Sequence, residues 1–516
     1  MSDSKEEISR RAALQRAAAA GAGLAAGSGV LASGGARQVH GSVVGPGTQD
    51  DWFTKRAYSL SGNKVLGEDG KGAIPDASLA SRIYLPESAE EVSRLVKSLP
   101  PTTPIATIGG AHESSNVAML ASDNAVIFDM AKLNSIDFHR KGDELLVTVG
   151  AGVLFRPLVE AVRDHQGALP VGTGPDVGIV GYVLNGGISG YFSRRLGLLG
   201  QRVVQMTVVT ATGELRVVTP ADELFAAMLG AGSALAIVVD MTIRVAAESV
   251  VQGAEQRVFG FETREQAVQF SRDALRFMKA QVLPDDSVSM ELVVSGAKAL
   301  VVTVIFYDSF VGDAQTFIEP LMSLGTQLDL PVVDQATWST WYEAAAALWP
   351  VINDMVGDPL VTLQHAVGTV GVPSNEILDF VSDTIVAEFP LDEAGFSIIE
   401  IRTLGGAIFE GRQLPTGNFH HLFFVDFITL YDAKNKTVVQ RQGIADATKR
   451  VVDKSAEMKG LAVDFSGTHS QPDDLRTFTK ASTMFGTEDA AATVVALKRK
   501  MDPTNRFRFH PFKKLL

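Results

Sequence analysis

The sequence predicts an α+β protein with two domains, and three observations lead to this fold class. The chain has 516 residues, of which 46% are hydrophobic, so it can bury a sizeable core, and its length fits two domains better than one or four. Two glycine-rich segments that also contain β-branched residues lie in the first half. Beyond about residue 250, strand patterns alternate with amphipathic helices, as expected for an antiparallel sheet with helices on one face.

The first glycine segment follows a short apolar run. Residues 104–108 are typical of a buried strand, and Gly109, Gly110 and Ala111 follow directly, before His112. Glycine lets backbone N–H groups approach a diphosphate closely, because no side chain intervenes and positive φ is accessible. Taken alone, the segment also fits an ordinary glycine-rich turn with a surface histidine.

The second glycine segment spans residues 172–190. It is not a flexible linker, since Val and Ile stand where a linker has Ser, and it lacks the three-residue period of collagen. Apolar side chains between glycines predict a backbone held to a core on one side and open to a large flat group, such as a flavin, on the other. The glycines are Gly172, Gly174, Gly178, Gly181, Gly186, Gly187 and Gly190.

Strands and helices of the second half are predicted from periodicity. Period-two runs indicate strands, and runs with apolar residues every three or four positions indicate helices. The strands are expected at residues 287–294, 299–307 and 418–430, and the helices at residues 264–283, 312–324 and 375–389.

The two glycine segments resemble those of the vanillyl-alcohol-oxidase or PCMH-type FAD-linked oxidoreductases, in the berberine-bridge-enzyme-like branch. Residues 109–114, Gly-Gly-Ala-His-Glu-Ser, resemble the family loop Gly-Gly-Gly-His-Ser, and residues 177–187 resemble its second glycine motif. The family's first helix, hairpin and C-terminal signature have counterparts in the same order. The resemblance implies an FAD-binding PCMH-type domain at residues 75–250, a substrate domain at residues 251–475, and a segment at residues 476–516 that returns to the first domain.

The resemblance also implies a covalent bond between His112 and the 8α-methyl carbon of FAD. Some relatives add a second bond through Cys, but Gly174 stands at that position and the chain has no cysteine, so we expect one link. The alternative is a non-covalent flavin against which His112 packs or hydrogen-bonds. The cofactor-binding residues implied are Thr107, Ile108, Gly109, Gly110, Ala111, His112, Glu113, Ser114, Thr173, Gly174, Pro175, Val177, Gly178, Gly181, Tyr182, Asn185, Gly186, Gly187, Ile237 and Asn505.

Two segments depart from the family pattern. Residues 226–236 keep the small residues of a flavin-contacting segment but lack its Arg, Asn and aromatic residues, which we interpret as a divergent flavin site. Residues 461–466 lack the Tyr that many relatives use in the active site. The usual phenolate base is therefore missing, and another group must accept the proton.

Asp426 is the first candidate for that group. Strand alternation places it on one face with Phe424 and Ile428, and an acid among apolar side chains is desolvated, which raises its pKa toward the range useful for proton abstraction. We expect Asp426 to be the general base or a substrate-binding acid. The alternative is a structural Asp that pairs with a neighbouring Arg on a solvated face.

Other candidates for the proton are His421 and Tyr431. Glu400, in the stretch 397–402, is another inward-facing candidate, although an ion pair with Arg402 on the same strand face is the simpler account. No metal is expected, because the histidines show no pair at helical spacing with a nearby acid.

The aromatic residues Trp338, Trp341, Tyr342 and Trp349 are spaced as on a helix buried against a sheet, so a core role is favoured over a sugar-binding platform. The formal net charge of −13 argues against nucleic acid as a partner, since phosphate binding needs clustered Lys and Arg.

Residues 1–36 are typical of a twin-arginine export signal. Arg10 and Arg11 precede a run of small apolar residues at 17–32, which is too rich in Ala and Gly for a stable membrane span. The alternative is a disordered Ala-rich tail. Because the twin-arginine machinery carries folded proteins, it suits a flavoprotein that acquires its cofactor in the cytoplasm, and the expected location is periplasmic or extracellular.

These observations predict an exported FAD-dependent oxidoreductase that moves a hydride from a CH–OH or CH–NH group of a small molecule to flavin N5. Oxygen or another acceptor would then reoxidise the flavin. Three alternatives remain: a flavin-binding protein without turnover, a non-covalent flavin dehydrogenase that uses an acceptor other than oxygen, and an exported module for an unrelated nucleotide.

Overall fold

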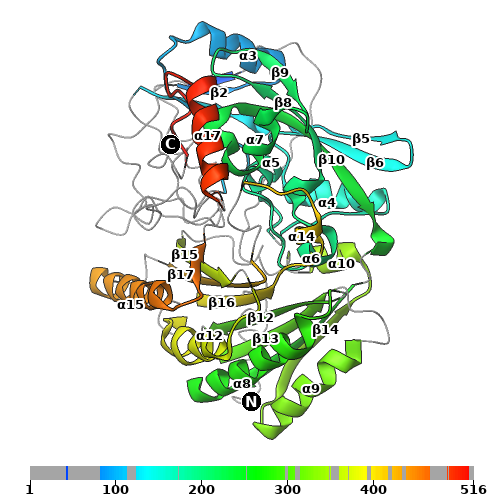
Figure 1. Cartoon of the computed structure of the whole chain (residues 1–516), viewed down its shortest axis with the longest axis vertical. Coiled ribbons are helices and arrows are strands. Elements are labelled where there is room, and N and C mark those ends of the chain that lie inside the picture. The colour runs from blue at the N-terminus through cyan, green and yellow to red at the C-terminus, as the bar shows by residue number, and fades with distance from the viewer. Residues whose placement is uncertain are drawn as a thin grey trace, which may run out of the picture.

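The computed structural model describes a large part of the chain, to which all structural statements below refer. The described residues are 42–44, 82–112, 124–172, 174–250, 253–286, 288–296, 300–307, 314–347, 349, 360–369, 371–391, 397–415, 421–432, 437–464, 485 and 487–510. They form two bodies, one with two smaller sheets and one with a single broad sheet (Figure 1). We call these the first and the second domain. The mixed α+β class expected from the sequence is confirmed.

The first domain begins with a four-stranded sheet of order β1-β2-β4-β3, in which β2, β4 and β3 run parallel. Helix α3 (Ala89–Ser98) connects β2 to β3, and the Ser88 side chain caps it by accepting a hydrogen bond from the Glu91 backbone N–H. The strands are β1 (Ser42–Val44), β2 (Arg82–Leu85), β3 (Ile105–Ile108) and β4 (Val126–Asp129).

A second, antiparallel sheet of the first domain has the order β5-β6-β10-β8-β9, with β7 paired to β10. Its strands are β5 (Ile136–Lys141), β6 (Glu144–Gly150), β7 (Gly167–Ala168), β8 (Val203–Val209), β9 (Leu215–Val218) and β10 (Ile237–Ala247). Its helices are η1 (Met130–Lys132), α4 (Phe155–Asp164), α5 (Ile179–Leu184), α6 (Ser193–Leu196), η2 (Leu199–Arg202), α7 (Glu223–Leu235) and η3 (Glu248–Val250).

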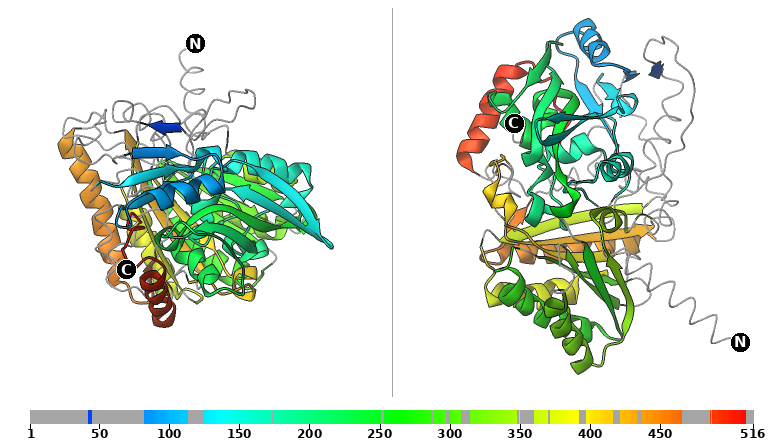
Figure 2. Two further views of the ribbon diagram at one scale, coloured as in Figure 1. Left: turned by 90° about the horizontal axis from the view of Figure 1, so that it is seen from above. Right: turned by 90° about the vertical axis from the view of Figure 1, so that its right-hand side faces the viewer.

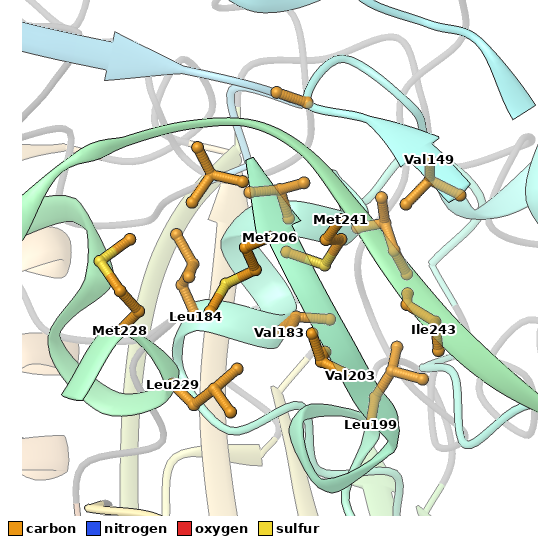
Figure 3. Close-up of a cluster of buried hydrophobic side chains, with 14 of the residues drawn as sticks. Val149, Val183, Leu184, Leu199, Val203, Met206, Met228, Leu229, Met241 and Ile243 are labelled. Carbon is orange, nitrogen blue, oxygen red and sulfur yellow. The ribbon is translucent and has the colours of Figure 1, made fainter. Parts of the chain in front are cut away.

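Helix α5 carries part of the second glycine segment, and the core holds it on one side. Val183 and Leu184 of α5 lie among buried residues of β8, β10 and α7, including Met206, Met241 and Leu229 (Figure 3). Gly181, on the same helix, is exposed, and a Cβ there would meet no atom of the described residues within 4 Å. The segment is therefore anchored on one side and open on the other, as its glycine and valine pattern predicts.

The second domain contains one antiparallel sheet of order β14-β11-β13-β12-β16-β17-β15-β18. Its strands are β11 (Ala254–Phe261), β12 (Ser289–Gly296), β13 (Leu300–Tyr307), β14 (Val332–Trp338), β15 (Leu360–Thr369), β16 (Ser397–Thr403), β17 (Phe423–Asp432) and β18 (Ala462–Asp464). The helices are α8 (Arg264–Phe277), η4 (Met278–Val282), α9 (Ala314–Gln327), α10 (Trp341–Ala346), α12 (Asn375–Phe380), η5 (Val381–Val386), α14 (Ala407–Glu410) and α15 (Val438–Glu457).

The two faces of this sheet pack against different partners. Phe423, Val425 and Phe427 of β17 share a core with residues of α8 and α12, which lie on the side away from the first domain (Figure 1). Phe424, between them, belongs to the core of the first domain. Because strand side chains alternate, the even-numbered residues of β17 face the first domain.

Side chains also connect the two domains directly. Arg194 of α6 is fully buried and donates hydrogen bonds to the Leu404 carbonyl and to Asp286, both at 2.7 Å. Gln201 of η2 donates to the Ile408 carbonyl at 2.8 Å. These contacts fix the broad sheet relative to the glycine segments.

The C-terminal helix α17 (Glu488–Met501) packs on α7 of the first domain (Figure 2). The Lys498 ammonium group is buried and donates to the Ala234 carbonyl at the end of α7 and to Asp502. The backbone N–H of Ile105, at the start of β3, donates to the Arg506 carbonyl at 2.8 Å. The last described residues are thus attached to the first domain.

Several elements differ in detail from the sequence-based expectations. The predicted strand at 418–430 begins only at Phe423, so His421 precedes the strand. The helices expected at 264–283 and 375–389 both continue from an α-helix into π-helical turns, η4 and η5, because the hydrogen-bond spacing changes while the apolar pattern does not.

The aromatic group is part of the core, but it does not lie on one helix. Trp338 is the last residue of β14, whereas Trp341 and Tyr342 begin α10, so the single-helix interpretation is wrong. Trp341 is fully buried and its indole N–H donates to the Leu169 carbonyl at 2.9 Å. The Arg156 guanidinium stacks over Trp349. None of the helices in the described ranges has the length and apolarity needed to cross a lipid bilayer.

Candidate functional site

The two glycine segments contact each other through their backbones. A Cβ on Gly110 would lie 2.4 Å from the Gly178 nitrogen, and a Cβ on Gly178 would lie 2.5 Å from the Gly110 nitrogen. A Cβ on Gly109 would lie 2.9 Å from the Ala151 carbonyl oxygen. Glycine is required at these positions because another stretch of main chain lies against each of them, and the contact between Gly110 and Gly178 brings the two segments side by side.

His112 follows the contact at Gly110 by two residues. Ala111 before it has a φ of +53°, which turns the chain sharply after the glycine pair. The histidine is half-buried, and its Nε2 atom is buried without a hydrogen-bond partner among the described residues. Burial lowers the pKa of His112 to about 4, although a backbone hydrogen bond acts in the opposite direction. The imidazole is therefore neutral at pH 7.

The remainder of the first segment leads into this turn. Thr107 and Ile108 are the last residues of β3, and Ile108 is buried. Glu113 and Ser114 lie outside the described residues, as does Thr173 of the second segment.

Residues 174–178 run alongside the start of α4. The Pro175 carbonyl accepts a hydrogen bond from the Arg156 N–H, and the Val177 carbonyl accepts one from the Phe155 N–H. The Gly174 carbonyl accepts one from the Val177 N–H. These carbonyls are occupied by protein donors.

Helix α5 and the turn after it use several of the expected cofactor residues for local structure. The Tyr182 ring packs on Gly187, and its hydroxyl donates to the Pro170 carbonyl at 3.3 Å. Asn185 donates from its side-chain amide to the Gly181 carbonyl. Gly186 and Gly187 have φ values of +94° and +74°, so a left-handed turn requires glycine there.

Two further expected cofactor residues lie apart from the glycine segments. Ile237 begins β10 and is buried in the core of the first domain. Asn505 is exposed, with a φ of +51°, in the turn after α17. That turn adjoins the start of β3, whereas Gly109 follows its end, so the structure does not bring Asn505 to the contact between the glycine segments.

The small residues of 226–236 serve helix packing. A Cβ on Gly230 would lie 2.0 Å from the Pro415 carbonyl oxygen, and one on Gly232 would lie 2.5 Å from the Leu184 side chain. Helix α7 therefore needs these glycines to approach other parts of the protein. The interpretation of their smallness as flavin contact finds no support in these contacts.

A charged cluster lies on the face of the broad sheet that is turned toward the first domain. It consists of Arg402 and the carboxylates Glu291, Glu400 and Asp426, and we call it the Arg402 cluster. Glu291 on β12 stands opposite Arg402 on β16, and Glu400 on β16 stands opposite Asp426 on β17. Three adjacent strands thus contribute to one group of side chains.

The contacts of Arg402 hold the cluster together. Its Nε donates to Glu291 at 2.7 Å, a terminal nitrogen donates to Glu400, and the other lies 3.7 Å from Asp426. All three carboxylates are buried. The expected ion pair between Glu400 and Arg402 is confirmed. Asp426 also faces an Arg, as the structural alternative proposed, but the face is buried and not solvated.

The Arg402 cluster adjoins the second glycine segment. A Cβ on Gly190 would lie 2.4 Å from Arg402 Nε, so this glycine leaves room for the guanidinium. Tyr182 and Tyr191 of the first domain lie close enough to interact with the charge of Arg402. The cluster therefore faces the same part of the first domain that the glycine segments form.

Burial and charge together set the protonation of the cluster. Burial raises the pKa of Glu400 well above its usual value, the charges of Glu291 and Asp426 raise it further, and Arg402 opposes them. Burial lowers the pKa of Arg402, but the three carboxylates outweigh this effect and raise it. Glu291 was missed in the sequence, since only the sheet order reveals that β12 lies beside β16.

The other two candidates for proton transfer are placed differently. His421 is buried and lies over β15, where a Cβ on Gly368 would come within 2.4 Å of its Nδ1. Its ring centroid is 6.3 Å from that of Phe424, which faces the first domain. Tyr431 lies on β17 opposite Val361, and its side chain is outside the described part. Within the described ranges, no group of three His, Asp or Glu side chains is arranged to hold a metal ion.

Comparisons with known proteins identify the first domain. Residues 80–219 match the model of the FAD binding domain family. An FAD-linked oxidoreductase of Aspergillus terreus is 32% identical over 163 residues, which are 31% of this chain and 32% of that protein. The (R)-6-hydroxynicotine oxidase of Paenarthrobacter nicotinovorans is 29% identical over 143 residues, 27% of this chain and 30% of that protein. The matches thus span about a third of these relatives.

Solved structures resemble nearly the whole chain. Berberine bridge enzyme from Eschscholzia californica superposes with a TM-score of 0.70 at 14% identity, covering 92% of this chain and 96% of that one. The 6-hydroxy-D-nicotine oxidase of Arthrobacter nicotinovorans superposes with a TM-score of 0.67 at 19% identity, covering 92% and 97%. At these identities the likeness establishes the fold.

The residues present fit the cofactor, since among the described residues Nε2 of His112 lacks a partner and none lies within 4 Å of a Cβ on Gly181. The resemblance drawn from the glycine motifs is confirmed: the chain contains an FAD binding domain and has the fold of the PCMH-type FAD oxidoreductases to which berberine bridge enzyme belongs.

Proposed function

We propose that this chain is an exported FAD-dependent oxidoreductase that transfers a hydride from a CH–OH or CH–NH group of a small molecule to flavin N5, with the flavin bonded to His112. The observation that carries the proposal is the position of the Arg402 cluster, which faces the glycine segments of an FAD binding domain. The glycine segments would bind the cofactor, and the acids of the Arg402 cluster would face it from the other domain. This arrangement suits a reaction that removes a hydride and a proton from adjacent substrate atoms.

The glycine segments would hold the FAD, and His112 would tether it. A neutral imidazole is the form that can bond to carbon, and the low pKa of His112 keeps it in that form. An FAD in this place supplies a hydride acceptor at N5. Gly174 offers no second point of attachment.

Asp426 is the proposed acceptor of the substrate O–H or N–H proton. It is a buried carboxyl group on the face turned toward the first domain, and Arg402 positions it from 3.7 Å. His421 is the second candidate, since its ring neighbours Phe424 on the same face. Replacing Asp426 with Asn should lower kcat without loss of bound flavin.

The covalent link has a direct test. Purified protein is precipitated in acid, and the absorption of pellet and supernatant is recorded. We expect the yellow colour of the unaltered protein in the pellet. For His112→Ala we expect it in the supernatant, or in neither fraction if the variant binds no flavin. A yellow supernatant from the unaltered protein would support the non-covalent dehydrogenase instead.

Turnover is tested by anaerobic mixing with a panel of sugars, alcohols and amines. Bleaching of the flavin absorption by at least one compound supports the oxidoreductase, and readmission of air or addition of a dye distinguishes oxygen from another acceptor. A flavin that no compound bleaches would support a binding protein without turnover. A colourless protein would refute the flavin assignment.

The export proposal rests on Arg10 and Arg11 and on the small apolar run at 17–32, which lie outside the described residues. Replacement of both arginines by lysine should leave the protein in the cytoplasm, because the twin-arginine machinery reads that pair. The measurement is the amount of protein in periplasm and medium. Unchanged export of the double variant would contradict the proposal.

A further inference from the structure

Two short segments interlock where the domains meet, residues 193–202 of the first domain and residues 404–412 of the second. We call them the interdomain joint; they contain the helices α6 and α14, which lie side by side (Figure 1). Gln201 donates from its side-chain amide to two carbonyls of the second segment, at 2.8 and 3.0 Å. A Cβ on Gly406 would lie 2.5 Å from the Arg194 carbonyl oxygen. Because the packing is this close, a shift of one segment displaces the other.

Each segment of the joint continues from one half of the candidate site. The first segment follows the second glycine segment, and two backbone N–H groups of η2 donate to the carbonyls of Gly186 and Gly187, at 3.0 and 2.9 Å. The second segment follows β16, whose penultimate residue is Arg402. The joint therefore connects the backbone of the glycine segment to the strand that carries the centre of the Arg402 cluster.

Arg194 is the buried side chain through which the joint reaches two strands of the broad sheet. One terminal nitrogen donates to the Leu404 carbonyl at 2.7 Å, and the other donates to the Asp285 carbonyl at 2.9 Å and the Asp286 carboxylate at 2.7 Å. Leu404 directly follows β16, and Asp286 comes shortly before β12, the strand of Glu291. One guanidinium group thus contacts the ends of both strands that supply Arg402 and two of its carboxylate partners.

The planar shape of the guanidinium group suits this arrangement. Its terminal nitrogens have fixed and different directions, so a single side chain binds two segments at a set separation. A lysine has one nitrogen on a flexible stem, and it keeps the positive charge without the fixed geometry. The substitution Arg194→Lys therefore removes the spacing and leaves the charge in place.

We propose that Arg194 is a positioning residue of the oxidoreductase, which sets the separation between the acids of the Arg402 cluster and the flavin held by the glycine segments. This inference rests on the proposed function. In that reaction the substrate carbon is oxidised as a hydride leaves to flavin N5, and the O–H or N–H proton passes to Asp426. Both acceptors must contact the substrate at once, so a change in their separation lowers the rate.

The test is the first-order rate constant of flavin bleaching, measured by anaerobic stopped flow on the purified holoprotein. The probe is the compound of the sugar, alcohol and amine panel that bleaches the unaltered protein fastest. A first-order rate constant does not depend on how much protein is folded or how much flavin is retained, so a merely structural role would not change it. A misplacement of about 1 Å can lower a rate about a hundredfold. For Arg194→Lys we expect the limiting rate constant to fall at least tenfold, while the half-saturating substrate concentration changes less than threefold.

The matched control is Arg195→Lys on the same helix. Arg195 is exposed and donates to the Val250 carbonyl at 3.3 Å, inside the first domain, so its rate constant should equal that of the unaltered protein. If Arg194→Lys does not fold, Asp286→Ala decides. It removes one acceptor of Arg194 at a position that is 65% exposed, and it should lower the rate constant at least twofold.

An unchanged rate constant in the deciding variant, an equal fall in Arg195→Lys, or a loss confined to the half-saturating concentration would overturn the positioning role. These results leave the oxidoreductase in place, since the unaltered protein still bleaches. A holoprotein whose flavin no compound bleaches would instead contradict the proposed function, and the positioning role with it. The two failures are therefore distinguishable in one set of measurements.

Discussion

The glycine segments of the first domain and the Arg402 cluster of the second domain adjoin at Gly190, yet they are held in shape by different means. The glycine segments meet backbone to backbone at Gly110 and Gly178, where there is no room for a single additional carbon. The Arg402 cluster is held by ion pairs between side chains of three strands. Space should therefore limit which substitutions the glycine segments tolerate, and charge should limit which substitutions the Arg402 cluster tolerates.

The first prediction concerns charge and has the largest expected effect. Arg402→Leu removes the cation that Glu291, Glu400 and Asp426 share, and leaves buried acids that must either take up protons or remain uncompensated. We expect a loss of about 3 to 5 kcal/mol in the free energy of unfolding at pH 7, measured by urea denaturation.

A matched control is Arg276→Leu. Arg276 pairs with Asp379 at the surface, where its side chain is 48% exposed, so the change should cost less than about 1 kcal/mol. Similar losses in the two variants would show that the Arg402 cluster is not an electrostatic unit.

The second prediction concerns space. Gly110→Ala places a methyl group against the backbone of Gly178, which no side-chain rotation can relieve, so we expect a loss of about 1 to 3 kcal/mol together with reduced flavin content. Thermal denaturation and the ratio of flavin to protein absorbance measure the two effects. A fully stable Gly110→Ala protein would contradict the backbone contact.

The glycine segments could be predicted from the sequence because the residues that define them are neighbours in the chain. A strand, two glycines and a histidine stand within nine residues, and their order survives in the structure as β3, the Gly110 contact and His112. What the sequence did not reveal is the reason for each glycine. Gly110 and Gly178 make room for each other, and Gly230 makes room for residue 415, before any cofactor is considered.

Only part of the Arg402 cluster could be predicted from the sequence, because its members are far apart in the chain. Alternation within single strands placed Asp426 on the same face as Phe424, and paired Glu400 with Arg402. Glu291 lies more than a hundred residues earlier, and its contact with Arg402 at 2.7 Å depends on β12 being the neighbour of β16. Strand order is a property of the whole sheet, which no local pattern specifies.

The third prediction is a pH dependence that isolates Glu400. Its pKa is raised in the folded protein above the unfolded value of 4.5, so the folded state holds a proton that the unfolded state has lost. Ionising Glu400 therefore costs the folded protein no stability below about pH 4.5. Above that pH, the free energy of unfolding falls by about 1.4 kcal/mol for each pH unit until the folded pKa is reached.

Glu400→Gln removes this titration. Relative to the unaltered protein, the variant should become progressively more stable as the pH rises above 4.5 toward the raised pKa of Glu400, as measured by urea denaturation at a series of pH values. A stability difference that does not change with pH would show that Glu400 is ionised in both states.

The fourth and smallest prediction concerns Gly181, which is the counterpart of Gly110 on the open side of the second glycine segment. A Cβ there meets nothing within 4 Å, and Gly181 lies inside helix α5, where alanine is favoured over glycine by about 0.5 to 1 kcal/mol. Gly181→Ala should therefore fold with unchanged or slightly higher stability when the protein is produced without flavin. If FAD lies over this face, the same methyl group should reduce flavin retention, so that stability and flavin content change in opposite directions. A variant that loses stability without flavin, as Gly110→Ala should, would mean that protein and not cofactor covers the face.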